Sequence, residues 1–166
     1  MHMDRLLDVV RSFDGVLELA PVPGSEFPQI AWGDHFFYFS PDGLIPERVQ
    51  PYATVVTKNY PDDTSSDLDP PDRWRLNIHV GRSVLAELVG GGSESDAAPI
   101  DFGNSDTVLP HPVYRAQGWI CIVNPGVRTT DLTLGLLRRA HEDARRRAFV
   151  ATERRLDRRS EQGRRS

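Results

Sequence analysis

Every second side chain between residues 73 and 80 is apolar, and the side chains between them are polar. Successive side chains of a strand point to opposite faces of a sheet, so this alternation is typical of a strand with one buried face. The other face would carry Arg75, Asn77 and His79 side by side. We therefore predict a strand here with a polar face that can meet solvent or a ligand.

Apolar residues three and four positions apart indicate helices at three places. Residues 3–13 and 130–149 carry the longest such patterns, and residues 83–89 carry a shorter one. Runs rich in β-branched and aromatic residues predict further strands at 16–20, within 29–58 and at 117–124. The element order, α-β-β-β-β-α-β-α, contains no repeated strand–helix–strand unit. It predicts an α+β fold in which one antiparallel sheet has its helices packed on one face.

The same pattern divides the chain into a body and a tail. Residues 1–149 are predicted to form a single α+β domain, since 166 residues is about one domain's length. Beyond residue 149 the apolar stripe gives way to arginine-rich repeats, which predicts a flexible C-terminal tail at 150–166. Two loops interrupt the body: residues 59–72 are rich in aspartate and proline, and residues 90–106 are linker-like.

The net charge of −4 hides a strong asymmetry. Residues 1–137 hold 9 Lys and Arg against 19 Asp and Glu, a net −10, whereas residues 138–166 hold 11 Arg against 5 acids, a net +6. An acidic body repels phosphate backbones, so any nucleic-acid contact would come from the basic C-terminal segment. Lysine is nearly absent, with one residue beside 19 arginines, a bias that indicates an actinobacterial type of sequence.

The expected compartment follows from the cysteine count and the apolar runs. Cys121 is the only cysteine and lies in an apolar run, which predicts a buried thiol and excludes an internal disulfide. No apolar run approaches the ~20 residues of a membrane span. The first residues lack the apolar core of a signal peptide. The sequence therefore predicts a cytoplasmic protein without membrane contact.

Sequence motifs that would name a reaction are missing. There is no nucleophile elbow, phosphate-binding loop, dinucleotide fingerprint, paired-cysteine motif or zinc-protease motif. The acidic loop at 59–72 lacks the glycine and terminal glutamate of a calcium loop. We predict neither a metal ion nor a cofactor, and the sequence leaves open whether the protein is an enzyme.

Candidate chemistry gathers on the predicted polar face. Arginine, asparagine and histidine at positions 75, 77 and 79 suit a ligand carboxylate or phosphate, and Lys58 is expected on the neighbouring strand. The alternative is that this face of a half-covered sheet is simply solvated.

A second candidate is His111, which two prolines hold between them and which lies near Tyr114. A fixed imidazole there can serve as a general acid or base, or it can be a turn histidine bonded to the main chain. Asp34 precedes a histidine at a predicted strand start, but adjacent strand residues point to opposite faces, which argues against a shared metal site.

Four stretches together resemble an actinobacterial family of uncharacterised small proteins, some of which carry the label erythromycin esterase. They are residues 31–43, 53–63, 75–82 and 110–126. The element order also resembles, more distantly, the MmcQ/YjbR-like group, which implies an antiparallel sheet with flanking helices. Neither resemblance supplies catalytic residues, and no serine here lies in a nucleophile elbow, so the esterase label is not adopted.

We therefore predict a protein that binds a small molecule, such as an accessory enzyme of specialised metabolism, with its pocket on the polar sheet face. His111 and Lys58 are the predicted catalytic residues. The predicted ligand-binding residues are Asp34, Tyr60, Arg75, Asn77, His79 and Tyr114. Two alternatives stay open: a nucleic-acid-binding module that uses the basic C-terminal segment, and a protein-interaction domain without a ligand. The sequence assigns no oligomeric state.

Overall fold

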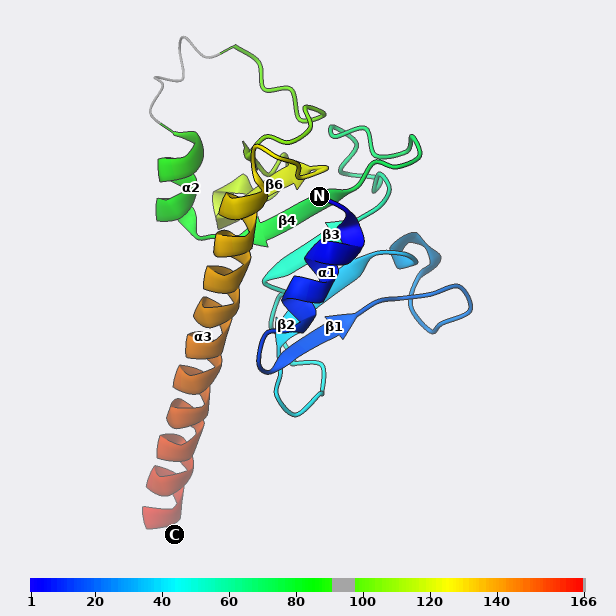
Figure 1. Cartoon of the computed structure of the whole chain (residues 1–166). Coiled ribbons are helices and arrows are strands. Elements are labelled where there is room, and N and C mark those ends of the chain that lie inside the picture. The colour runs from blue at the N-terminus through cyan, green and yellow to red at the C-terminus, as the bar shows by residue number, and fades with distance from the viewer. Residues whose placement is uncertain (91–97, 166) are drawn as a thin grey trace.

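A six-stranded antiparallel sheet organises the chain (Figure 1). The structure is a computed structural model that describes residues 1–90 and 98–165. Across the sheet the strand order is β1-β2-β3-β4-β6-β5, and each neighbouring pair is antiparallel. The strands are β1 (Val16–Leu19), β2 (His35–Phe39), β3 (Ala53–Val56), β4 (Arg75–His79), β5 (Leu109–Pro110) and β6 (Trp119–Val123).

Helices complete the α+β class that the sequence predicted, and the single antiparallel sheet is confirmed. They are α1 (Met3–Arg11), α2 (Arg82–Val89) and α3 (Thr130–Arg164), with short 3₁₀ turns η1 (Gln29–Ala31) and η2 (Arg115–Gln117). The edge strand β5 was not predicted, because two residues that include a proline carry no periodic signal. Within the described residues, no helix is both long and apolar enough to cross a membrane.

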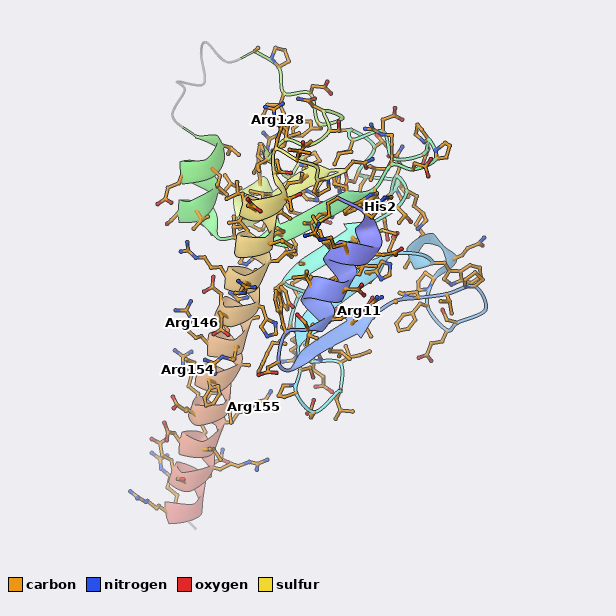
Figure 2. All side chains as sticks on the ribbon, viewed as in Figure 1. His2, Arg11, Arg128, Arg146, Arg154 and Arg155 are labelled. Atoms are coloured by element: carbon orange, nitrogen blue, oxygen red, sulfur yellow. The ribbon has the colours of Figure 1, made fainter. Side chains whose placement is uncertain are left out.

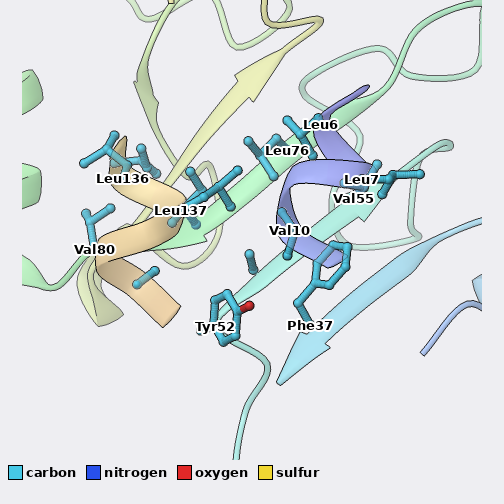
Figure 3. Packing of buried hydrophobic residues seen from close by; sticks show 14 of the residues in the cluster. Leu6, Leu7, Val10, Phe37, Tyr52, Val55, Leu76, Val80, Leu136 and Leu137 are labelled. Atoms are coloured by element: carbon cyan, nitrogen blue, oxygen red, sulfur yellow. The ribbon is translucent and has the colours of Figure 1, made fainter. Parts of the chain in front are cut away.

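The hydrophobic core lies on one face of the sheet (Figure 3). Apolar side chains of α1 and of the first turns of α3 pack against alternate residues of the central strands, as a two-residue period requires. Val84 of α2 joins the same cluster. The fully buried members from the strands include Phe37, Val55, Leu76, Ile78 and Ile120. The opposite face of the sheet therefore lies outside this core.

Helix α3 is longer than the sequence pattern predicted. The apolar stripe does thin out near residue 149, but the helix continues to Arg164 with every side chain from residue 150 onward exposed. A helix that is already nucleated gains one hydrogen bond for each residue it adds, so it can continue beyond the residues that pack against the body. The segment that the sequence predicts to be a flexible tail is thus helical as far as Arg164. The division into a body and a flexible tail stays a prediction.

The turn that leads into α3 is anchored by Asp106, a residue from an earlier loop. Asp106 accepts hydrogen bonds from the backbone N–H groups of Gly126 (2.8 Å), Arg128 (3.0 Å) and Thr129 (3.0 Å), and from the Thr129 hydroxyl (2.7 Å). These bonds lower the pKa of Asp106 to about 2, although desolvation acts to raise it. The predicted linker at 90–106 thus ends in an anchor, while its residues 91–97 lie outside the described part of the chain.

Candidate functional site

The sheet face opposite the core is the floor of a groove of about 1140 Å³. The β3–β4 register sets Thr54 beside Asn77, and the β4–β6 register sets Asn77 beside Cys121. Because β2 and β4 end beside α3 (Figure 1), residues 144–151 of that helix form one wall. The loops at 46–51, 60–63 and 111–117 supply the other walls. The groove is built from segments far apart in the sequence.

The predicted polar trio does line this groove. Arg75, Asn77 and His79 follow one another along β4 on the open face, as the alternation of the sequence predicted. Tyr60 and Tyr114 also line it, and so do the aromatic side chains of Tyr38 and Trp119. Whether these residues bind a ligand stays a prediction.

Arg75 lies in a buried polar cluster beneath the groove, which we call the Arg75 cluster: Asp63, Ser66, Arg75, Asn77 and His111. The guanidinium donates from Nη1 to Asp63 Oδ1 and Ser66 Oγ (both 2.9 Å), from Nη2 to Asp63 Oδ2, and from Nε to Asn77 Oδ1 (2.8 Å). Arg75 is 2% exposed. Its charge is balanced by Asp63 and its donors are mostly used, so little of it remains for a ligand anion.

The ring nitrogens of His111 also have partners within the protein. Its Nδ1 accepts hydrogen bonds from the backbone N–H groups of Val113 (3.1 Å) and Tyr114 (3.0 Å), so the neutral ring carries its proton on Nε2. Nε2 lies 3.2 Å from Arg75 Nη2 and 3.8 Å from Asp63 Oδ2. Burial and the nearby Arg75 lower the pKa of His111 to about 4, against the opposing effect of Asp63. The ring is therefore neutral at pH 7 and has no free lone pair.

The other member of this pair, Asp63, is held as a carboxylate. Burial acts to raise its pKa, but the hydrogen bonds and the charge of Arg75 outweigh burial and lower it. Arg75 and Asp63 therefore neutralise each other beneath the groove.

Lys58 and Asp34 form a separate cluster outside the groove lining. The Asp34 carboxylate is fully buried and accepts from Lys58 Nζ (2.9 Å), from the Thr57 N–H and hydroxyl (both 2.8 Å), and from the Tyr60 hydroxyl. Lys58 Nζ also donates to the carbonyl of Trp32 (2.7 Å). Desolvation and Asp34 raise the pKa of Tyr60. Asp34 and Lys58 thus position Tyr60, whose ring lines the groove, and contact the site only through it.

His79 lies on the groove floor at the α3 end of β4. Its Nε2 donates to the carbonyl of Gln117 (3.0 Å), and its ring meets the Trp119 indole edge to face with centroids 5.5 Å apart. Burial and Arg147 lower the pKa of His79, although the Gln117 bond and Asp143 act to raise it. Within the described residues no donor bonds to its Nδ1, so this histidine keeps an acceptor for a ligand.

Sequence reasoning missed two residues of the site. Asp63 lies in an irregular loop, and only the tight Tyr60–Asp63 bridge brings it under Arg75. Arg147 lines the groove from α3. A signal for Arg147 was present, because Ala140, Ala144 and Ala151 follow at helical spacing on the side of α3 that faces the body, and residue 147 falls in that stripe.

Comparison with protein families gives one match, over residues 1–155. The chain belongs to the DUF6194 family. That family is described as one of unknown function, which confirms the prediction of an uncharacterised family. A search of curated proteins gave no match to the chain, and neither did a search of solved structures. The function of this DUF6194 protein must therefore be argued from the geometry of its own site.

Proposed function

We propose that the protein binds a small, largely apolar organic molecule in the groove on the open sheet face. One observation carries this proposal: a groove of about 1140 Å³ has aromatic walls over a floor whose buried charges are already neutralised. Ligand sites of proteins are typically concave, mostly apolar and fitted with a few fixed polar groups. The groove of this chain has these properties, and the polar groups of its floor are already hydrogen-bonded to one another.

The arrangement supports binding more than acid–base catalysis at His111. A general base needs a free lone pair, and the Nδ1 lone pair of His111 is shared by two backbone N–H groups. Lys58, the second predicted catalytic residue, bonds to Asp34 and Trp32 instead of lining the groove. The predicted accessory role in specialised metabolism and the actinobacterial type stay part of this proposal.

The proposal is tested with N-phenyl-1-naphthylamine, a neutral apolar dye that fluoresces when it leaves water. We expect saturable binding by the full chain. Ala148 lines the groove from α3, so Ala148→Trp places an indole inside the groove and should weaken dye binding at least tenfold. Fluorescence titration measures both dissociation constants.

The matched control is Val150→Trp, which adds the same side chain to an exposed position of the same helix outside the groove lining. It should leave dye affinity within twofold, and both variants should keep the circular dichroism spectrum of the parent. Dye binding that is absent, or that Ala148→Trp and Val150→Trp change equally, would overturn the proposed function.

A further inference from the structure

The charged side chains that line the groove differ in whether they already form an ion pair within the protein. Arg48, Arg75 and Arg147 line it, against Asp62 and Asp63, which leaves one net positive charge. Arg75 and Asp63 neutralise each other in the buried ion pair. Two exposed arginines and one exposed aspartate then remain on the groove surface. The groove therefore carries one net positive charge, which favours an anionic ligand over a cationic one.

Arg147 is the better placed of the two remaining cations. Its neighbours on α3 are paired, Arg145 with Glu142 and Arg146 with Asp143, whereas Arg147 has no ion pair among the described residues. Its charge reaches His79 on the groove floor, since it contributes to the lowered pKa of that histidine. Arg147, His79 and Trp119 line the same groove, and the rings of His79 and Trp119 pack together.

The apolar surface for a ligand body adjoins this cation. The Trp119 indole and the Tyr38 ring line the groove, together with the alanines that precede and follow Arg147 on α3. A flat apolar molecule can lie against these surfaces and carry an acidic group to Arg147, whose planar fork matches carboxylate, sulfonate or phosphate oxygens. His79 adds the unbonded Nδ1, which accepts a hydrogen bond from a ligand hydroxyl or N–H.

We infer that the ligand is an aromatic or similarly flat organic acid whose acidic group is bound by Arg147 beside His79. The inference rests on the proposed function and names its ligand class. It moves the anion-binding role away from Arg75, where the sequence alone placed it, to a helix residue of the basic C-terminal segment. The chemistry at issue is binding, with no covalent step.

Two dyes with the same aromatic body separate the inference from the proposed function. 8-Anilinonaphthalene-1-sulfonate is N-phenyl-1-naphthylamine with one added sulfonate. We expect the full chain to bind the sulfonate dye about tenfold more tightly, since a hydrogen bond to a charged group contributes on that order. In Arg147→Ala the ratio of the two affinities should fall to within about twofold. Arg147→Lys should keep part of the advantage because it keeps the charge.

The matched control is Arg146→Ala, one residue away on the same helix and outside the groove lining (Figure 2). It removes the same formal charge and should leave the affinities for both dyes within twofold. If the neutral dye binds in the groove but the sulfonate adds nothing, or if Arg146→Ala and Arg147→Ala have equal effects, the inference fails and the proposed function stands. If neither dye binds, both fail.

Discussion

At the scale of single residues, the partners of a side chain decide what it can still do. The sequence places Arg75 and His111 among polar residues, and both residue types suit a ligand or a catalytic step. In the structure their hydrogen-bonding capacity is spent on Asp63, Ser66 and the backbone after residue 111. They form the support of the groove, and the residues free to meet a ligand lie around them.

This support predicts a specific pH dependence of stability. The pKa of His111 is lowered to about 4 in the fold, below the unfolded value of about 6.5, so the unfolded chain takes up the proton first as pH falls. Its contribution is present above about pH 6.5 and is lost on acidification towards pH 4. Between pH 7 and pH 5 we expect the free energy of unfolding to fall by about 2 kcal/mol through this group.

The variant His111→Asn isolates that contribution. Its side-chain oxygen can still accept from the N–H groups of Val113 and Tyr114, but it does not titrate. Urea denaturation at pH 7 and pH 5 should show a smaller loss of stability than in the parent chain. His79, whose pKa is also lowered, titrates in both proteins and cancels in the comparison. Equal losses in the two proteins would show that His111 is not the group responsible.

The polar face of β4 could be predicted because a two-residue period is visible in the letters of the sequence. The partners of that face could not, because Asp63 and Ser66 lie in an irregular loop whose path depends on backbone turns. The same holds for Lys58, which was expected to face the groove and instead contacts Asp34. Periodicity predicts which face a residue occupies, and it says nothing of a loop that folds over that face.

At the scale of elements, the turn before α3 is anchored by a distant loop. Thr129 occupies the N-cap position of α3, and its hydroxyl donates to Asp106. Asp106 also accepts from the backbone N–H groups of Gly126, Arg128 and Thr129, just before the first helical residue. A carboxylate at this end also opposes the positive pole of the helix dipole. The loop before β5 is thereby tied to the last helix.

We expect Asp106→Ala to lower the free energy of unfolding by at least about 1 kcal/mol, because it removes the acceptor of three backbone N–H groups and one hydroxyl before α3. The measurement is chemical denaturation at pH 7, where the carboxylate is fully ionised because its pKa lies near 2. Asp101→Ala is the control, since among the described residues the Asp101 side chain accepts only a local backbone bond from Gly103 (3.0 Å). A loss no larger than that of the control would contradict the anchoring role.

Some ends of helices and strands could be predicted from the apolar pattern of the sequence, and others could not. The first helix and β4 were predicted within about two residues, because packed elements keep their period. The far end of α3 was not, because its side chains from residue 150 onward are exposed and hydrogen bonding alone continues the helix. The apolar pattern predicts which residues of a helix or strand pack against the core. The helix or strand itself can continue beyond those residues.

At the scale of the whole molecule, charge and packing divide the chain at nearly the same place. Residues 138–166, which include the exposed end of α3, carry 11 of the 19 arginines, and 19 of the 24 acidic residues lie before them. Arg154 and Arg155 extend from the helix well beyond the sheet (Figure 2). The fold and the groove should therefore be independent of this end.

Deleting residues 153–166 tests that independence. The deletion spares the groove wall at 144–151 and removes 6 Arg and 3 acids, so the net charge changes from −4 to −7. We expect the thermal midpoint to change by no more than about 2 °C and binding of N-phenyl-1-naphthylamine to stay within twofold. Loss of dye binding would show that the groove needs the whole helix.

The same pair of proteins tests the nucleic-acid alternative. Affinity for a nonspecific DNA duplex at low salt should be confined to the full chain and should fall steeply as salt is added. A duplex affinity that survives the deletion would place nucleic-acid binding on the body, against its charge.

Helix α3 extends from the groove wall far into solvent. Residue 144 is the first residue of α3 that lines the groove, and residue 164 lies 20 positions further along, about 30 Å away at 1.5 Å per residue. A tilt of about 2° at the wall then displaces the tip by about 1 Å. Because α3 continues into solvent beyond the groove wall, a small displacement of the wall on ligand binding would become a larger displacement of the helix tip. A probe attached at the tip would therefore report ligand binding more sensitively than a probe in the groove.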